Sequence, residues 1–335
     1  MSAATIGIGL LPTFNTLGYL SPTLLILLRL LQGFAVSGEQ GGVIVFLSET
    51  LELGKGFLGA LMLSSVYVGV SIGALLCLII NLVFSTQEIN QWAWCLPFLL
   101  SIFLGMISLI LRLNILESTE FTQVRKDKLI LKNPLKHLIK NNMKLLIKTV
   151  LFIVPQTICI YLYIVFFPNY FSNFLVSHNA MFITTLNMVF LAFFVPIFGY
   201  ISDKIKPERM FLAGCFALLG YAILILNISN EKDIEVMIGI QLLLGLITML
   251  VSAPLFAILV ESFLINSRYT GVSLTFNLST SIFGGTTPAL ASFLVNQCGF
   301  HALGYYLLIA SLLGIVFSDH TRNSSHKRYT PANAY

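Results

Sequence analysis

Charged side chains are scarce in this chain. Asp, Glu, Lys and Arg make up 10% of the 335 residues, against about 25% in an ordinary soluble domain. Hydrophobic residues make up 57%, and the mean hydropathy is +0.89. This balance excludes a soluble domain and predicts an all-α protein that crosses a membrane many times. The pI near 8.9 reflects Lys and Arg in loops, so we expect no nucleic-acid partner.

Clusters of metal-binding or catalytic side chains are also lacking. The five cysteines (Cys77, Cys95, Cys159, Cys215, Cys298) are scattered singly, and the five histidines fall in loops or near segment ends. A membrane enzyme would need a metal cluster, a nucleophile with its base, or paired acids within the membrane, and none of these spacings occurs. We therefore expect no enzyme activity, no metal and no cofactor.

Apolar runs predict ten membrane segments, arranged as four and then six. They cover residues 1–14, 22–47, 57–84, 93–113, 144–167, 180–202, 209–227, 235–263, 269–296 and 301–318. This gives an amino-terminal helical region (1–113) whose first segment is short, a basic linker (114–143), a six-helix carboxy-terminal half (144–318) and a tail (319–335). The first 28 residues carry no charge, so the basic start of a secretory signal is missing.

The positions of Lys and Arg predict the orientation. All 19 except Arg29 and Lys232 fall in alternate loops or the tail, and loops enriched in Lys and Arg stay in the cytoplasm. Both termini are therefore predicted to be cytoplasmic. In the linker, Leu135, Leu138 and Ile139 are spaced for a short amphipathic turn on the membrane surface.

Two charges lie inside the segment 22–47. Burying Arg29 or Glu39 at membrane depth costs several kcal/mol, so such residues normally face a bundle interior or a watery cavity and have a partner. The two are ten positions apart, about 15 Å along a straight helix, and cannot pair with each other there. We interpret both as functional candidates. The alternative is that Arg29 only extends its side chain to the membrane interface.

Small residues recur every fourth position around these charges. Gly33, Ser37 and Gly41 mark one face, and Gly38 with Gly42 marks the next. Such spacing lets neighbouring helices approach closely, so we expect neighbours on both sides of this helix. The alternative is that the glycines serve packing alone.

An internal repeat appears when the two parts are offset by 215 residues. Gly56 then falls on Gly271 and Gly69 on Gly284, while Glu49 with Lys55 lies near the counterparts of Glu261 with Arg268. Parallel repeats of about six helices are typical of transporters. The counterparts of Arg29 and Glu39 are Leu244 and Pro254. Because the repeat tolerates apolar residues there, we interpret the two charges as serving ligand or proton handling.

Several motifs resemble one transporter family. They are Arg29-Leu-Leu-Gln32-Gly33-Phe34 with Gly38-Glu39, Trp92-Ala93-Trp94 with Pro97-Phe98, Leu116-Glu117-Ser118 with Phe121, and Arg268-Tyr269-Thr270-Gly271 with Asn277 and Gly284-Gly285. Together they resemble the metabolite:proton symporters of the major facilitator superfamily, in the form seen in bacterial proline/betaine transporters.

The resemblance implies a two-halved helix bundle in a bacterial inner membrane. It would carry a small polar solute together with protons by alternating access, driven by the proton gradient and without an obligatory protein partner. Arg29 with Gln32 would bind an anionic group, Glu39 would carry the proton, and Tyr67 or Tyr161 would offer aromatic faces to an ammonium group. For both tyrosines ordinary packing stays open, and a dicarboxylate would suit the same arginine as well as a proline- or betaine-like solute.

The turn at residues 199–209 resembles the superfamily's gating loop, although it lacks the second glycine and one basic residue. It supplies Asp203, Lys204 and Arg209 as gate candidates, beside the repeat-related charges Glu49, Lys55, Glu261 and Arg268. Asp203 is expected to cap the following helix, to meet a cation, or to be only a turn residue. Ser37 and Cys95 depart from the family pattern, which leaves the solute open.

The amino-terminal part is short by comparison with its repeat. Under the 215-residue offset, the segment 209–227 corresponds to positions that begin six before Met1. Two helices of a twelve-helix bundle then have no counterpart. The alternative function is therefore an inactive fragment of such a transporter, which would not transport when expressed alone.

Overall fold

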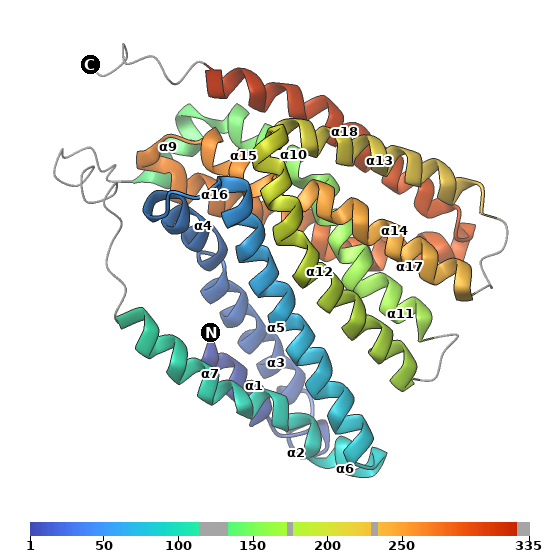
Figure 1. Ribbon diagram of the computed structural model, residues 1–335. Helices are drawn as coiled ribbons and strands as arrows, with labels where there is room; N and C mark the ends of the chain where they lie inside the picture. The colour runs from blue at the N-terminus through green and yellow to red at the C-terminus, as the bar shows by residue number, and fades with distance from the viewer. Residues whose placement is uncertain (114–132, 173–176, 229–233, 327–335) are drawn as a thin grey trace.

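Every regular element in the described residues is a helix. The computed structural model describes residues 1–113, 133–172, 177–228 and 234–326 (Figure 1). The amino-terminal group contains α1 (Ser2–Gly9), α2 (Phe14–Leu17), α3 (Leu20–Val36), α4 (Glu39–Thr50), α5 (Lys55–Val83), α6 (Thr86–Gln91), η1 (Ala93–Cys95) and α7 (Leu96–Leu113). Most of the predicted linker, with the Leu116–Phe121 motif, and the end of the predicted tail lie outside the described residues.

The carboxy-terminal group is longer. It contains α9 (Pro134–Asn141), α10 (Met143–Tyr161), η2 (Leu162–Phe166), α11 (Phe167–Phe171), α12 (Ser177–Ile205), α13 (Pro207–Leu226), α14 (Ile234–Ser252), α15 (Leu255–Ser262), α16 (Ile265–Ser279), η3 (Thr280–Gly284), α17 (Gly285–Cys298) and α18 (Ala302–His326). Eight helical stretches of the described chain are long and apolar enough to cross a membrane, and 302–318 is a shorter one. With α1 they correspond to the ten predicted segments, so the predicted all-α membrane fold is confirmed.

Two membrane helices are interrupted at related places. The first break, at Ser37 and Gly38, separates α3 from α4, and the second, at Ala253 and Pro254, separates α14 from α15. The breaks lie 216 residues apart, within one residue of the offset of the sequence repeat. Pro254 explains the second break, because proline lacks the N–H that a continuous helix needs.

The two helix groups meet along α5 and α12, which cross the molecule side by side (Figure 1). Ser64 of α5 donates a hydrogen bond of 2.6 Å to the Ala192 carbonyl of α12. A second junction joins α4 to α16, and a third joins α5 to α15. Both groups are therefore joined through helices that begin or end at the same side of the bundle.

Burial is unequal between the two groups. In an 18-residue apolar window of the stretch 143–171 the buried share is 72%, and in that of 235–262 it is 83%, whereas in that of 20–50 it is only 6%. Gly33 of α3 has nothing within 4 Å of an added Cβ, while Gly41 and Gly42 of α4 press on α16. The expectation of close neighbours on both sides is therefore correct for α4 and wrong for α3, because the main described neighbours of α3 are the short elements α1, α2 and α4.

The predicted amphipathic turn in the linker is the short helix α9. Asn133 caps it by accepting a hydrogen bond of 3.1 Å from the Lys136 backbone N–H. Leu138 is fully buried, while Leu135 and Ile139 are exposed. Contacts with α10 and α16 fix the helix at the same side of the bundle as the junction of α4 and α16.

Candidate functional site

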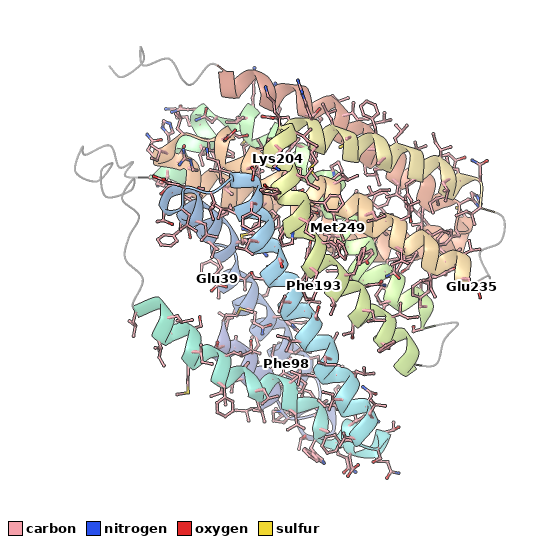
Figure 2. The ribbon with its side chains drawn as sticks, in the orientation of Figure 1. Glu39, Phe98, Phe193, Lys204, Glu235 and Met249 are labelled. Atoms are coloured by element: carbon pink, nitrogen blue, oxygen red, sulfur yellow. The ribbon has the colours of Figure 1, made fainter. Side chains whose placement is uncertain are left out.

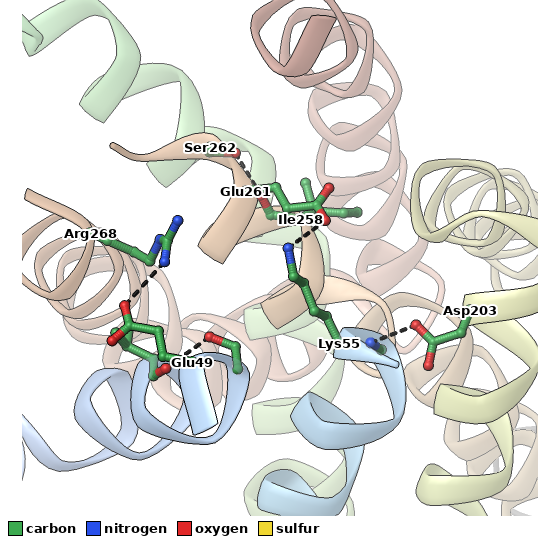
Figure 3. A network of polar contacts seen from close by, with 10 residues as sticks. Glu49, Lys55, Asp203, Ile258, Glu261, Ser262 and Arg268 are labelled. Atoms are coloured by element: carbon green, nitrogen blue, oxygen red, sulfur yellow. Dashed lines mark hydrogen bonds and ion pairs between the residues drawn. The ribbon is translucent and has the colours of Figure 1, made fainter. Parts of the chain in front are cut away.

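Two ion pairs join the helix groups at one end of the bundle (Figure 3). Arg268 of α16 donates to Glu49 Oε1 of α4 at 3.1 Å, and Lys55 of α5 lies 3.0 Å from Glu261 Oε1 of α15. Each pair takes its acid from the end of one interrupted helix and its base from the start of a helix in the other group. The arrangement is reciprocal, as the sequence repeat requires. We call this end of the molecule the basic end.

The two pairs differ in burial. The side chains of Arg268 and Glu49 are 19% and 6% exposed, whereas those of Lys55 and Glu261 are 40% and 42% exposed. A solvated pair contributes about 0–1 kcal/mol. Removing one partner of a buried pair costs far more, because the remaining charge stays desolvated. The pair of Glu49 and Arg268 is therefore the stronger link.

Asp203 adds a third link at the basic end. Its carboxylate accepts hydrogen bonds from the backbone N–H groups of Gly56 at 2.7 Å and Phe57 at 2.8 Å, the first turn of α5 in the other helix group. A Cβ on Gly56 would lie 2.7 Å from Asp203 Oδ1, so only glycine permits this approach. A carboxylate at a helix amino terminus satisfies orphan N–H groups and complements the helix dipole. Asp203 thus caps α5 and not the helix that follows it in the chain.

The remaining gate candidates lie beside this network. The Lys204 ammonium lies 4.4 Å above the centre of the Tyr200 ring, a cation–π contact within α12. Arg209 stands in the first turn of α13. The structure therefore brings five of the seven gate candidates together.

The break between α3 and α4 is bound by side chains of α16 that the sequence had not marked as functional. The Tyr269 hydroxyl donates to the Gly38 carbonyl at 3.3 Å, and Asn277 Nδ2 donates to the Ser37 carbonyl and, at 2.7 Å, to that of Ser273. The Gly38 carbonyl also accepts the helical bond from the Gly42 N–H at 3.0 Å, whereas a carbonyl freed by a helix break, such as that of Ser37, needs another donor at membrane depth. We call Tyr269 and Asn277 the break clamp.

The break clamp depends on the small residues of α4. A Cβ on Gly38 would lie 2.6 Å from the Tyr269 hydroxyl, and one on Gly42 would lie 2.9 Å from the same ring. Since Tyr269 and Asn277 are eight positions apart, they lie on one face of α16. The sequence signal that could have identified the clamp is the pair Gly38 and Gly42, because small residues mark where a large side chain of a neighbouring helix fits.

The predicted charged pair of the first interrupted helix lies on both sides of this break. Arg29 of α3 is exposed and donates to Gln32 Oε1 at 3.3 Å, and Gln32 Nε2 donates to Thr5 Oγ1 of α1 at 2.6 Å. Glu39 is the first residue of α4, directly after the two clamped carbonyls (Figure 2). The described partner of Arg29 is thus a residue of its own helix, and Arg29 does not face a bundle interior.

The two candidate tyrosines are packed. Tyr67 of α5 is 3% exposed, and its hydroxyl lies beside that of Ser252 at the end of α14. Tyr161 ends α10, and its ring would meet a Cβ on Gly284 at 2.6 Å. Both positions fit the packing interpretation that the sequence left open.

A buried polar network lies within the carboxy-terminal group. Asn187 Nδ2 donates to Gln241 Oε1 at 2.8 Å, and Gln241 Nε2 donates to the Tyr163 carbonyl at 3.3 Å. The Tyr163 hydroxyl donates to the Asn187 carbonyl at 3.4 Å. Because every member has a partner, the network orients α12, α14 and η2 relative to one another.

Sequence comparison shows which family shares this architecture. The chain matches the Major Facilitator Superfamily over residues 1–285 and again over 157–334. The chain belongs to the major facilitator superfamily. Since this is a family of transporters, the protein is a membrane transporter and not an enzyme.

Relatives within the superfamily are bacterial. A Staphylococcus aureus protein named for proline/betaine transport is 30% identical over an alignment of 333 positions, which covers 94% of this chain and 69% of the relative. The proline/betaine transporter of Salmonella typhimurium is 28% identical over an alignment of 350 positions, which covers 99% of this chain and 69% of the relative. The citrate-proton symporter of Klebsiella pneumoniae is 28% identical over 321 residues, with coverages of 94% and 72%. The predicted family resemblance is confirmed, and the chain is shorter than these superfamily relatives.

Proposed function

We propose that this protein is a secondary active transporter that carries a small polar solute together with a proton by alternating access. The observation that supports it most directly is the pair of reciprocal ion pairs at the basic end, Glu49 with Arg268 and Lys55 with Glu261. Links of this kind hold one end of two helix groups closed and can break and reform as the groups move.

The solute class follows from the relatives and from Arg29. The relatives are named for proline/betaine transport and for citrate-proton symport, and each of these solutes carries a carboxylate. A guanidinium binds a carboxylate in a planar, bidentate manner, and Gln32 holds the Arg29 guanidinium from one side. We assign Arg29 and Gln32 to the anionic group of the solute. Tyr67 and Tyr161 would contact its cationic part once the groups separate.

Glu39 is proposed as the proton carrier. It starts α4 where the break clamp joins the two helix groups, so opening the basic end would change its surroundings. A carboxyl group whose environment alternates in this way takes up a proton on one side and releases it on the other. The repeat-related position is Pro254, directly before α15, and the residues around it are apolar.

The basic end is proposed to face the cytoplasm of a bacterium. Lys55, Lys136, Lys204 and Arg268 all lie there, as expected from the preference of Lys and Arg for the inner side. On this orientation residues 1–113 and 144–318 act as the two moving parts, and 114–143 links them on the inside.

Uptake assays test this function. The 335-residue chain and its Glu39→Gln variant are reconstituted in vesicles with an imposed pH gradient and offered radiolabelled proline, betaine or citrate. We expect Glu39→Gln to retain solute counterflow and to lose pH-driven accumulation, and Arg29→Ala to weaken both. Glu52→Gln, which changes an exposed acid in the loop after α4, is the matched control. Unchanged pH-driven accumulation in Glu39→Gln would make Glu39 structural.

A further inference from the structure

Two parallel stripes of side chains run along α9 and the start of α10. The basic stripe recurs every fourth residue and consists of Lys136, Lys140, Lys144 and Lys148. The apolar stripe lies one position earlier and consists of Leu135, Ile139, Met143 and Ile147, which are 44%, 44%, 43% and 52% exposed. Fourfold spacing on a helix keeps each stripe on one face.

The two helices almost join, but Asn142 between them has non-helical dihedrals of φ −129° and ψ 23°, so each helix carries its own part of the two stripes. Asn142 alone separates α9 from α10, its N–H donates to the Leu138 carbonyl, and its own carbonyl accepts from Leu146. The buried Leu138 and the Asn133 cap hold α9 in place. An eight-residue helix would be unstable alone, so its ordered position depends on these contacts.

Positive charge dominates the surroundings of the stripes. Between 134 and 161 the sequence contains no Asp or Glu, and neither does α16, which packs on both α9 and α10. Lys136, Lys140 and Lys144 are exposed. Lys148 is only partly exposed and has an interaction of its own, so it is left out of the site. Three exposed ammonium groups therefore border an exposed apolar strip.

We propose that α9 and the first turns of α10 form a binding site for the headgroup of an anionic phospholipid. The apolar stripe lies at the level where a spanning helix leaves the bilayer, so it contacts acyl chains, and the lysines one position on reach the phosphate layer. An anionic headgroup neutralises the lysines, because α9, α10 and α16 contain no acid that could do so. The proposed cytoplasmic orientation decides only which leaflet supplies the lipid. The site does not depend on which solute is carried.

The position of the site connects it to the gate. α9 and α10 both pack on α16, and α16 carries Arg268 and the break clamp. The three helices lie together at the basic end (Figure 1). A lipid held by the stripes would therefore act on the helix that closes this end.

Quenching of tryptophan by brominated lipids measures binding at this position. The two native tryptophans, Trp92 and Trp94, are replaced by Phe, and Ile139→Trp provides the reporter in vesicles of brominated phosphatidylglycerol or brominated phosphatidylcholine. Each lysine near the surface attracts an anionic lipid by about fivefold. We expect phosphatidylglycerol to be preferred over phosphatidylcholine by about fivefold or more.

Charge removal separates this site from a general effect of positive charge. The triple variant Lys136→Gln, Lys140→Gln, Lys144→Gln is expected to reduce the preference to below about twofold while quenching by phosphatidylcholine persists, which shows that the reporter still contacts lipid. The matched control removes three charges earlier in the chain, at Lys126, Lys128 and Lys132. Equal quenching by both lipids in the parent, no quenching by either lipid, or an equal loss of preference in the control would each overturn the proposal.

Discussion

Replacing Arg268 by Gln should open the basic end far more than replacing Lys55 by Gln. In the closed arrangement Glu49 is 6% exposed and is bonded to Arg268, which is 19% exposed. Without the arginine, the Glu49 charge remains desolvated when the end is closed and becomes hydrated when it opens. The cost therefore falls on the closed state alone.

The magnitude follows from the burial. Breaking a fully buried ion pair costs about 3–5 kcal/mol, and the residual exposure of Arg268 lowers this to about 2–3 kcal/mol. That corresponds to a change of about 30- to 150-fold in the ratio of open to closed molecules. The pair of Lys55 and Glu261 is 40% and 42% exposed, so its loss should change the ratio by less than about fivefold.

Distances between two spin labels measure this ratio. Thr50 follows the gate acid in α4 and Ile265 starts α16, and both are exposed, so labelled cysteines there report the separation of the two groups in a chain without its native cysteines. The double variant Glu49→Gln, Arg268→Gln should recover much of the closed population, because no buried charge is left. If Lys55→Gln opens the end as much as Arg268→Gln does, the burial argument is wrong.

Three further changes test other parts of the structure. Asn277→Ala removes part of the clamp on the α3–α4 break and should raise the ratio of open to closed molecules, measured with the same label pair, by about tenfold. Asn81→Ala, which loses only a bond to the Cys77 carbonyl of its own helix, should leave the ratio unchanged. Equal effects of the two changes would argue against the clamp. Gly56→Ala places a methyl group against the capping carboxylate and should lower the melting temperature by at least about 2 °C, and an unchanged value would contradict the cap. Single cysteines test the orientation: in intact cells an impermeant reagent should label Ser172→Cys and not Lys140→Cys, and the reverse pattern would invert it.

Hydropathy predicts the helices well because membrane-spanning chains must satisfy every backbone group within a helix. The gate charges were also visible, since Glu49 and Lys55 repeat near Glu261 and Arg268. The repeat aligns acid with acid and base with base, however, and does not predict which acid contacts which base. Only the packing of the two groups shows that each acid meets the base of the other group.

Contacts with the backbone left little trace in the sequence. Asp203 binds the backbone N–H groups of Gly56 and Phe57, and a backbone donor has no side-chain signature of its own, so the partner of Asp203 could be identified only in three dimensions. The break clamp is similar, because Tyr269 and Asn277 bind carbonyls. The exposure of Arg29 escaped prediction for another reason: the spacing of small residues predicts close neighbours around α3, whereas its described neighbours are short.

The two helix breaks are equivalent in position and different in what maintains them. The break between α14 and α15 is built into the chain, because Pro254 has no N–H to donate and its neighbours are buried within their own group. The break between α3 and α4 has no proline at Ser37 or Gly38 and is held from the other group by Tyr269 and Asn277. When the basic end opens, the Ser37 and Gly38 carbonyls lose these side-chain donors. The Gly38 carbonyl keeps its helical bond from the Gly42 N–H at 3.0 Å, so the favourable response within a membrane is for the Ser37 carbonyl to take up helical hydrogen bonding across the break. A helix that becomes continuous rotates the residue that follows the break. On the proposed function, that residue is the proton carrier Glu39, so the same two side chains that help close the gate also set the position of its carboxylate.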